Sequence, residues 1–138
     1  MLEDKPRVEA AIAIVVREDN LILVSRRRAD DTLGGYWEFP GGKCEDGETL
    51  EQCVVRELRE ELDISATPVR KLDPVEHDYP HLLLRLHPFL CRYDAGEMKF
   101  LECETACWIR PADLPQYQFP PANERLIAEV VALFATRR

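Results

Sequence analysis

The 138-residue sequence predicts an α/β fold in which helices cover both faces of a mixed β-sheet. Two segments, 50–62 and 122–135, carry apolar residues at the spacing of an amphipathic helix. Shorter runs of aliphatic and β-branched residues alternate with them, and polar or proline-rich turns separate these runs. A chain of this length fits one core, so we expect residues 1–138 to form a single domain.

The first two strands are expected at 10–16 and 21–25, which are aliphatic runs on either side of a polar turn. Such a pattern is typical of a β-hairpin. A brief extended piece follows at 37–39 and ends at a proline-glycine-glycine turn.

A helix is expected at 50–62, where Thr49 and Gln52 form the capping-box pattern that marks a helix start. An apolar stripe runs along this helix to Leu62, where we expect it to end. The stripe consists of Leu50, Val54, Leu58 and Leu62.

Three more strands and a last helix complete the expected fold. The strands are placed at 68–76, 82–93 and 106–109. Residues 77–81 bridge the first two strands, 111–121 form a proline-rich connection, and 122–135 form the helix.

The charge and the N-terminal sequence exclude several classes of protein. A net charge of −8 argues against binding to duplex nucleic acid, which requires a basic surface. No apolar run is long enough to span a membrane, and the first ten residues lack the features of a secretory signal. We therefore expect a cytoplasmic location.

The five cysteines are too irregularly spaced to predict a disulfide framework or a zinc site. They are Cys44, Cys53, Cys91, Cys103 and Cys107. We expect reduced thiols that pack as small hydrophobic residues. The alternative for Cys44, which follows Lys43, is a reactive thiol in a loop.

Three glutamates on helix 50–62 predict a metal site. Glu57, Glu60 and Glu61 stand at positions i, i+3 and i+4, so they share one face of the helix. Their charges repel one another, and a hard divalent cation such as magnesium or manganese relieves that repulsion. The alternative is a solvated acidic face. A magnesium site in turn favours a substrate that carries phosphates.

The segment 42–64 resembles the Nudix box. The matching positions are Gly42, Glu48, Arg56, Glu57, Leu58, Glu60, Glu61 and Ile64. Asp63 stands where the Nudix family has glycine, and aspartate tolerates the left-handed conformation expected there. The resemblance implies an α/β/α sandwich and a hydrolase that acts on phosphoanhydride bonds.

Two further segments, WEFPGGK at 37–43 and FPPANE at 119–124, are similar to the MutT branch of that family. The resemblance implies a metal site made by Gly41, Glu57, Glu60, Glu61 and Glu102. It also implies a nucleotide pocket lined by Arg27, Phe39 and Asn123. The alternatives are an exposed loop charge for Glu102 and a helix cap for Asn123.

The MutT resemblance implies magnesium-dependent hydrolysis of a nucleoside triphosphate to a monophosphate and pyrophosphate, with manganese as a possible substitute. The expected role is to sanitise oxidised purine nucleotides such as 8-oxo-dGTP. We favour Glu57 as the general base, with Glu61 and Glu102 as alternatives. Arg56 would orient a neighbouring carboxylate, and Glu48 would anchor the loop to the helix.

Leu82 departs from the branch, which has an arginine at this position. Because leucine cannot donate a hydrogen bond, either the polar contacts of the pocket differ, or another residue such as His81 or Arg85 supplies them. One alternative function is therefore hydrolysis of CTP or a modified dCTP, and another is a non-catalytic nucleotide-sensing module. The expected partner is a small nucleotide, and the chain is expected to be a monomer or homodimer.

Overall fold

The computed structural model describes residues 5–135; the ends of the expected domain, 1–4 and 136–138, lie outside the described residues. The strands are β1 (Arg7–Val16), β2 (Ile22–Arg26), β3 (Trp37–Glu38), β4 (Gly41–Lys43), β5 (Ser65–Lys71), β6 (Val75–Asp78), β7 (Leu83–Ala95) and β8 (Thr105–Ile109). The helices are α1 (Leu50–Leu62) and α2 (Glu124–Ala135), with 3-10 helices η1 (Pro111–Gln116) and η2 (Pro121–Asn123).

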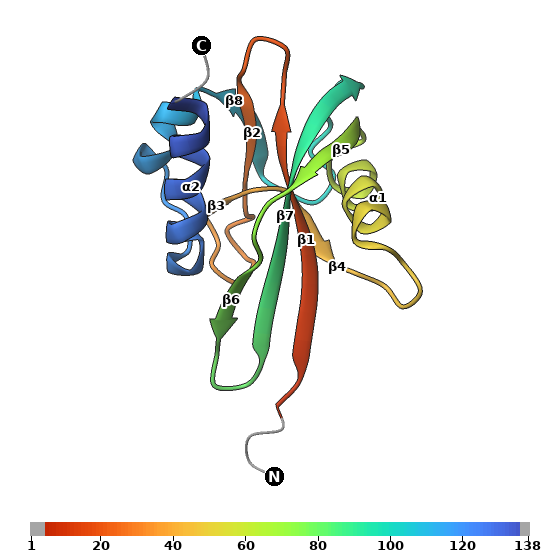
Figure 1. Ribbon diagram of the computed structural model, residues 1–138, viewed down its shortest axis with the longest axis vertical. Helices are drawn as coiled ribbons and strands as arrows, with labels where there is room; N and C mark the ends of the chain where they lie inside the picture. The colour runs from red at the N-terminus through yellow and green to blue at the C-terminus, as the bar shows by residue number, and fades with distance from the viewer. Residues whose placement is uncertain (1–4, 136–138) are drawn as a thin grey trace.

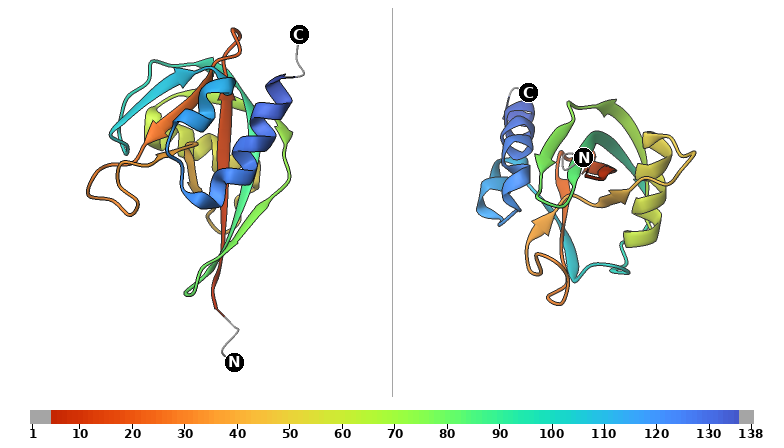
Figure 2. Two further views of the ribbon diagram at one scale, coloured as in Figure 1. Left: turned by 90° about the vertical axis from the view of Figure 1, so that its left-hand side faces the viewer. Right: turned by 90° about the horizontal axis from the view of Figure 1, so that it is seen from below.

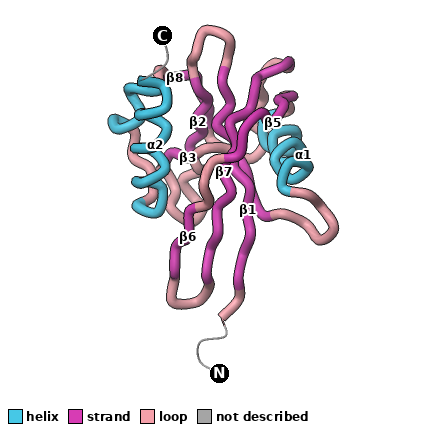
Figure 3. The backbone as a smooth tube through the Cα atoms, in the orientation of Figure 1, coloured by secondary structure: helices cyan, strands magenta, loops and turns pink. Residues whose placement is uncertain are grey.

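The strands form one mixed sheet with the central order β3-β2-β1-β7-β5. β1 and β7 are parallel from the Arg7–Leu83 pair to the Val16–Arg92 pair. The other pairings are antiparallel, and they attach β4 to β1, β6 to β7 and β8 to β2. Helices α1 and α2 lie on opposite sides of this sheet (Figures 1 and 2), and Figure 3 shows the strands between them. The predicted α/β sandwich is confirmed.

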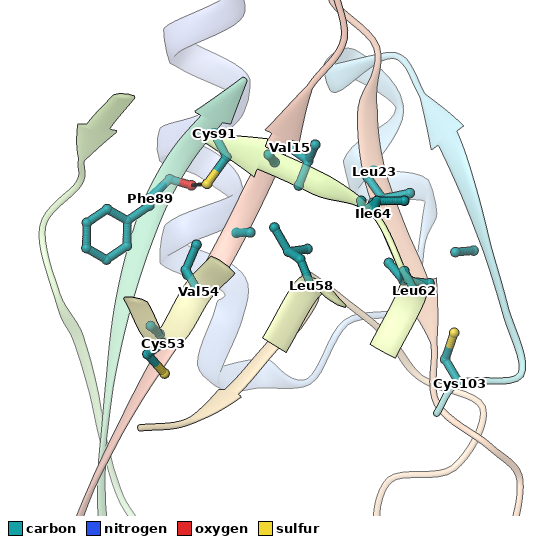
Figure 4. Packing of buried hydrophobic residues seen from close by; sticks show 14 residues of the cluster. Val15, Leu23, Cys53, Val54, Leu58, Leu62, Ile64, Phe89, Cys91 and Cys103 are labelled. Carbon is teal, nitrogen blue, oxygen red and sulfur yellow. Dashed lines mark hydrogen bonds between the residues drawn. The ribbon is translucent and has the colours of Figure 1, made fainter. Parts of the chain in front are cut away.

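Alternation along β1 divides the core between the two helices, because successive side chains of a strand point to opposite faces. Ala13 and Val15 belong to the cluster that packs against α1, whereas Ile12 and Ile14 belong to the cluster that packs against α2. Figure 4 shows the α1 side, where the predicted apolar stripe of the helix meets the sheet. Burial of this stripe fixes the rotation of α1 and therefore the direction of its glutamates.

Helix α1 has the predicted bounds and the predicted capping box. The Thr49 side chain accepts a hydrogen bond from the backbone N–H of Gln52, and the Gln52 side chain accepts one from Thr49 N–H. Asp63 caps the other end in the left-handed conformation, with φ 54° and ψ 40°.

Three expectations were wrong in detail. The two glycines of the turn expected after Pro40 are instead the start of strand β4, which forms by pairing with the distant strand β1. The single strand expected at 68–76 is split into β5 and β6, with Pro74, which has no N–H for a ladder, between them. The connection 111–121 contains 3-10 turns, and α2 begins at Glu124 rather than at residue 122.

Within residues 5–135, neither α-helix has both the length and the apolar character needed to cross a bilayer.

Candidate active site

The centre of the candidate site is the close approach of β4 to α1. A side chain at Gly42 would overlap the carboxylate of Glu57, and one at Gly41 would overlap the backbone of β1 at Ala11. The backbone of Gly41 also lies close enough to the Glu61 carboxylate to oppose the rise in its pKa. The two glycines therefore let the backbone contact both glutamates directly.

The glutamates of α1 lie in different surroundings. Glu57 and Glu61 are buried, whereas the Glu60 side chain is 48% exposed and accepts a hydrogen bond from Arg56 at 3.1 Å. Burial, together with the charges of Glu38, Glu57 and Glu102, raises the pKa of Glu61 to about 9. Burial likewise raises the pKa of Glu57, and Glu60 and Glu102 contribute in the same direction although Arg56 opposes them.

The structure thus brings Glu102, from the loop before β8, near Glu57 and Glu61, and it leaves Glu60 at the margin. No three acidic, histidine or cysteine side chains in the described part of the chain converge on one metal-binding point. Such spreading is expected of like charges that repel one another.

Glu38 is a further acidic group near the site that the sequence did not predict. Its carboxylate accepts a hydrogen bond from Arg27 at 2.8 Å, and burial raises its pKa although Arg27 partly offsets the effect. Arg27 also donates to the backbone oxygen of Thr32 at 2.6 Å and pairs with Asp31 at 3.3 Å. The only indication of this role in the sequence is the position of Glu38 inside the WEFPGGK segment.

Arg56 on α1 is hydrogen-bonded to the loop that precedes the helix. Its Nε and Nη2 donate to the two carboxylate oxygens of Glu48 at 2.6 and 2.9 Å, and Nη2 donates to the Lys43 carbonyl at 3.1 Å. Hydrogen bonding to Arg56 lowers the pKa of Glu48 to about 2, and the same hydrogen bond raises the pKa of Arg56. Bidentate pairs of this type combine strength with a fixed geometry.

A cavity of about 260 Å³ adjoins the two glycines. The predicted nucleotide-site residues Arg27, Phe39 and Asn123 all line it, and Glu38 does so as well. Unpredicted lining residues are Tyr79, Leu84 and Leu86. An apolar cavity with a few polar groups is the usual form of a small-ligand site.

Neither His81 nor Arg85 lines this cavity, so the proposed replacements for the missing arginine are wrong. Arg85 lies beside Glu76 with 3.6 Å between Nε and the carboxylate, and the His81 ring packs near that of Tyr79. Tyr79, which belongs to the same turn as His81, lies at the cavity wall instead.

The Asn123 side chain makes no hydrogen bond within residues 5–135, so it does not act as the cap of α2 there. Its amide is free to bind a ligand in the cavity. A larger groove of about 680 Å³ lies along α2 and is lined by apolar residues such as Tyr117 and Val131. That groove contains none of the predicted site residues, so the smaller cavity is the better candidate.

A family model described as NUDIX domain matches residues 11–129. The chain belongs to the Nudix domain family. This Nudix domain contains the loop, the helix and the cavity described above, and the prediction of a Nudix hydrolase from the sequence is confirmed.

The Nudix domain is similar to bacterial and archaeal proteins over nearly its full length. It is 37% identical to an 8-oxo-dGTP diphosphatase of Escherichia coli K12, over 92% of this chain and 98% of the relative. It is 33% identical to a CTP pyrophosphohydrolase of the same organism, over 91% and 93% respectively. The fold matches a MutT protein structure from Methanosarcina mazei with a TM-score of 0.82 at 24% identity, covering 97% of this chain and 99% of that chain.

Proposed function

We propose that this Nudix domain is a magnesium-dependent pyrophosphohydrolase that converts an oxidised purine nucleoside triphosphate, with 8-oxo-dGTP as the leading candidate, to its monophosphate and pyrophosphate. The observation that carries the proposal is the cavity lined by Asn123, Phe39 and Arg27 directly beside the buried glutamates of α1. This arrangement supports a binding mode in which the base occupies the cavity and the phosphates lie at the carboxylates.

The residues of the site fit a divalent metal. Glu57 and Glu61 are buried and repel each other, and their donors are all oxygen, which suits magnesium and allows manganese as a substitute. We propose that Glu57, Glu60, Glu61 and Glu102 and the Gly41 carbonyl hold it. When bound, such a metal neutralises charge on the phosphate oxygens and lowers the pKa of bound water.

The protein's own groups supply the remaining functions. Glu57 is the proposed general base that takes the proton from the attacking water, with Glu61 and Glu102 as alternatives. Arg56 orients the neighbouring carboxylate of Glu57, whose Oε1 lies 3.4 Å from its Nη1. Arg27 lies at the cavity wall, where we propose that it contacts the bound nucleotide.

Base recognition is assigned to Asn123, because an amide both donates and accepts hydrogen bonds, as a guanine-type ring requires. The CTP alternative is favoured by two observations: the chain is also similar to a CTP pyrophosphohydrolase, and Leu82 replaces the arginine of the MutT pattern. The sensing-module alternative is disfavoured because every carboxylate position of the Nudix box is occupied.

Initial rates of pyrophosphate release with magnesium test the proposal. We would compare 8-oxo-dGTP, dGTP, CTP and dCTP at low micromolar concentration. A large kcat/KM preference for 8-oxo-dGTP supports it, and a preference for CTP or dCTP transfers the proposal to the alternative substrate. Tight binding of all four nucleotides without turnover would establish the sensing module instead.

Glu57→Gln tests the base, with Glu51→Gln on the exposed side of the same helix as the matched control. We expect kcat to fall about 10²- to 10⁴-fold for Glu57→Gln only. Near-normal turnover of a folded Glu57→Gln protein would contradict the assignment. Isotope-labelled water then locates the cleaved bond, since label in the monophosphate indicates attack at the α-phosphorus and label in pyrophosphate indicates attack at the β-phosphorus.

The proposal also includes a single Nudix domain over residues 1–138, working in the cytoplasm as a monomer or homodimer. Sedimentation of the purified protein distinguishes the two assemblies.

A further inference from the structure

Cys44 comes directly after β4, on the face of that strand that looks toward α1. β4 pairs with β1 up to Lys43, and the Cys44 N–H continues the ladder by donating to the carbonyl of Glu9 at 3.1 Å. Alternate residues of a strand point to the same face, so Cys44 shares the face of Gly42. Gly42 packs against the carboxylate of Glu57 on α1.

Cys53 lies on the matching face of α1. It precedes Glu57 by four residues, so the two side chains lie one above the other on the helix. Two residues of strand span about 6.7 Å and four residues of helix span about 6 Å, so the step from Gly42 to Cys44 along β4 matches the step from Glu57 to Cys53 along α1. Figure 4 shows Cys53 beside Val54 on the side of α1 that faces the sheet.

The contacts agree with this geometry. Cys44 packs against the cluster that contains Cys53. Burial raises the pKa of the Cys53 thiol, and the neighbouring Cys44 thiol raises it further. Cys53 is fully buried, and its thiol also donates to the carbonyl of Gly42 with 3.6 Å between sulfur and oxygen. Cys44 is half-buried, so an oxidant from solvent reaches it first.

We propose that Cys44 and Cys53 form a reversible disulfide that responds to peroxide and lowers turnover at the adjoining carboxylate site. The Cys44 sulfur attacks one oxygen of hydrogen peroxide, the O–O bond breaks, and a sulfenic acid and water form. The Cys53 sulfur then attacks the Cys44 sulfur and releases the hydroxyl as a second water, which takes up the Cys53 proton. Two thiols are oxidised and one peroxide is reduced to two waters.

The cross-link acts on the site through two contacts. A disulfide brings the sulfurs to about 2.05 Å, well inside the contact distance of two separate thiols, so the end of β4 must move toward α1. The hydrogen bond from Cys53 to the Gly42 carbonyl is lost at the same time, and Gly42 is the residue that packs on Glu57. Arg56, whose Nη2 lies 4.0 Å from the Cys53 sulfur, is the second contact.

A peptide map tests the cross-link independently of any substrate. Trypsin cleaves after Lys43 and Arg56, so one fragment, 44–56, contains both cysteines. After peroxide treatment we expect this fragment to weigh less by two hydrogens and to resist alkylation until a dithiol reductant is added. A fragment that keeps two alkylatable thiols under peroxide would overturn the proposal.

Turnover of a nucleoside triphosphate tests the effect on the site, and this part rests on the proposed function. We expect a several-fold rate loss in peroxide that dithiothreitol restores, no such loss in Cys44→Ser, and the wild-type response in Cys107→Ser, another half-buried cysteine. An unchanged rate in the cross-linked protein would overturn the proposal that the disulfide lowers turnover. A protein with no activity in either state would contradict the proposed function, while the peptide map would still decide the disulfide.

Discussion

Glu38 connects the two parts of the candidate site. Its carboxylate binds Arg27 at 2.8 Å on one side, and its charge raises the pKa of Glu61 on the other. A glutamine here keeps a hydrogen-bond acceptor but removes the charge that holds the guanidinium. We expect Glu38→Gln to raise KM for a nucleoside triphosphate about fivefold, the equivalent of about 1 kcal/mol.

Asp31→Asn is the matched control for Glu38→Gln, because Asp31 also pairs with Arg27 but lies at 3.3 Å in an exposed loop. Steady-state kinetics of both variants provide the measurement. An equal rise in KM for the two variants would show that the buried carboxylate has no special part in holding Arg27.

Asn123 is the group assigned to the base. Its side chain lines the cavity and has no hydrogen-bond partner within the described residues. We expect Asn123→Ala to lower the kcat/KM ratio of 8-oxo-dGTP over dGTP about tenfold, because the lost hydrogen bonds contribute about 1.4 kcal/mol to discrimination. Gln118→Ala, which removes an exposed amide outside the cavity, should leave the ratio unchanged. An unaltered ratio in Asn123→Ala would show that another residue recognises the base.

The sequence predicted those site residues that belong to a spaced motif. The i, i+3, i+4 spacing brought Glu57 and Glu61 to one face of a helix, and the structure shows both beside Gly41 and Gly42. Glu38 and Tyr79 carried no such spacing. Their places depend on how β3 and the turn before β7 pack around the cavity, which local sequence does not specify.

Helix α1 ends in a strained conformation that a substitution can relieve. Asp63 has φ 54° and ψ 40°, a region that a residue with a Cβ atom enters at a cost. Its ion pair with Lys99 at 3.1 Å is exposed and contributes little to stability. We expect Asp63→Gly to raise the free energy of unfolding by about 0.5–1 kcal/mol and Asp63→Ala to lower it, as measured by urea denaturation. A higher free energy of unfolding in Asp63→Ala would contradict the conclusion that Asp63 is strained.

The elements that were predicted well are those whose signals are local. The bounds of α1 follow from the Thr49 capping box and a continuous apolar stripe, both readable within its own residues. Strand β4 was missed because its glycines resemble a turn, and it becomes a strand only by pairing with residues 10–12 of β1. The break between β5 and β6 depends similarly on their separate pairings with β7.

The stability of the whole protein depends on pH, and metal binding changes that dependence. Glu61 has its pKa raised to about 9 from the ordinary value of 4.5, so the folded state keeps a proton that the unfolded state releases. The metal-free protein therefore loses stability as the pH rises from about 4.5 to about 9. A bound cation removes this loss, because it favours the ionised carboxylate.

We expect magnesium to raise the Tm more at pH 8 than at pH 5.5. The same magnesium concentration is used at both pH values. At 100 times the Kd for pH 8, the expected rise in Tm at pH 8 is roughly 5–10 °C. Thermal unfolding with and without the ion provides the measurement, and Glu61→Gln should reduce the difference between the two pH values. A magnesium effect that is equal at both pH values would contradict the coupling.

The parallel pairing of β1 with β7 also has a consequence for how the chain is made. The ribosome releases β1 early, yet its parallel neighbour ends only at Ala95. Until then one edge of an apolar strand stays open, and pairing between distant segments is slow. Exposed strand edges promote aggregation of nascent chains. The hairpin with β2 covers only the opposite edge of β1, so the edge that β7 will occupy stays open until that strand has been made.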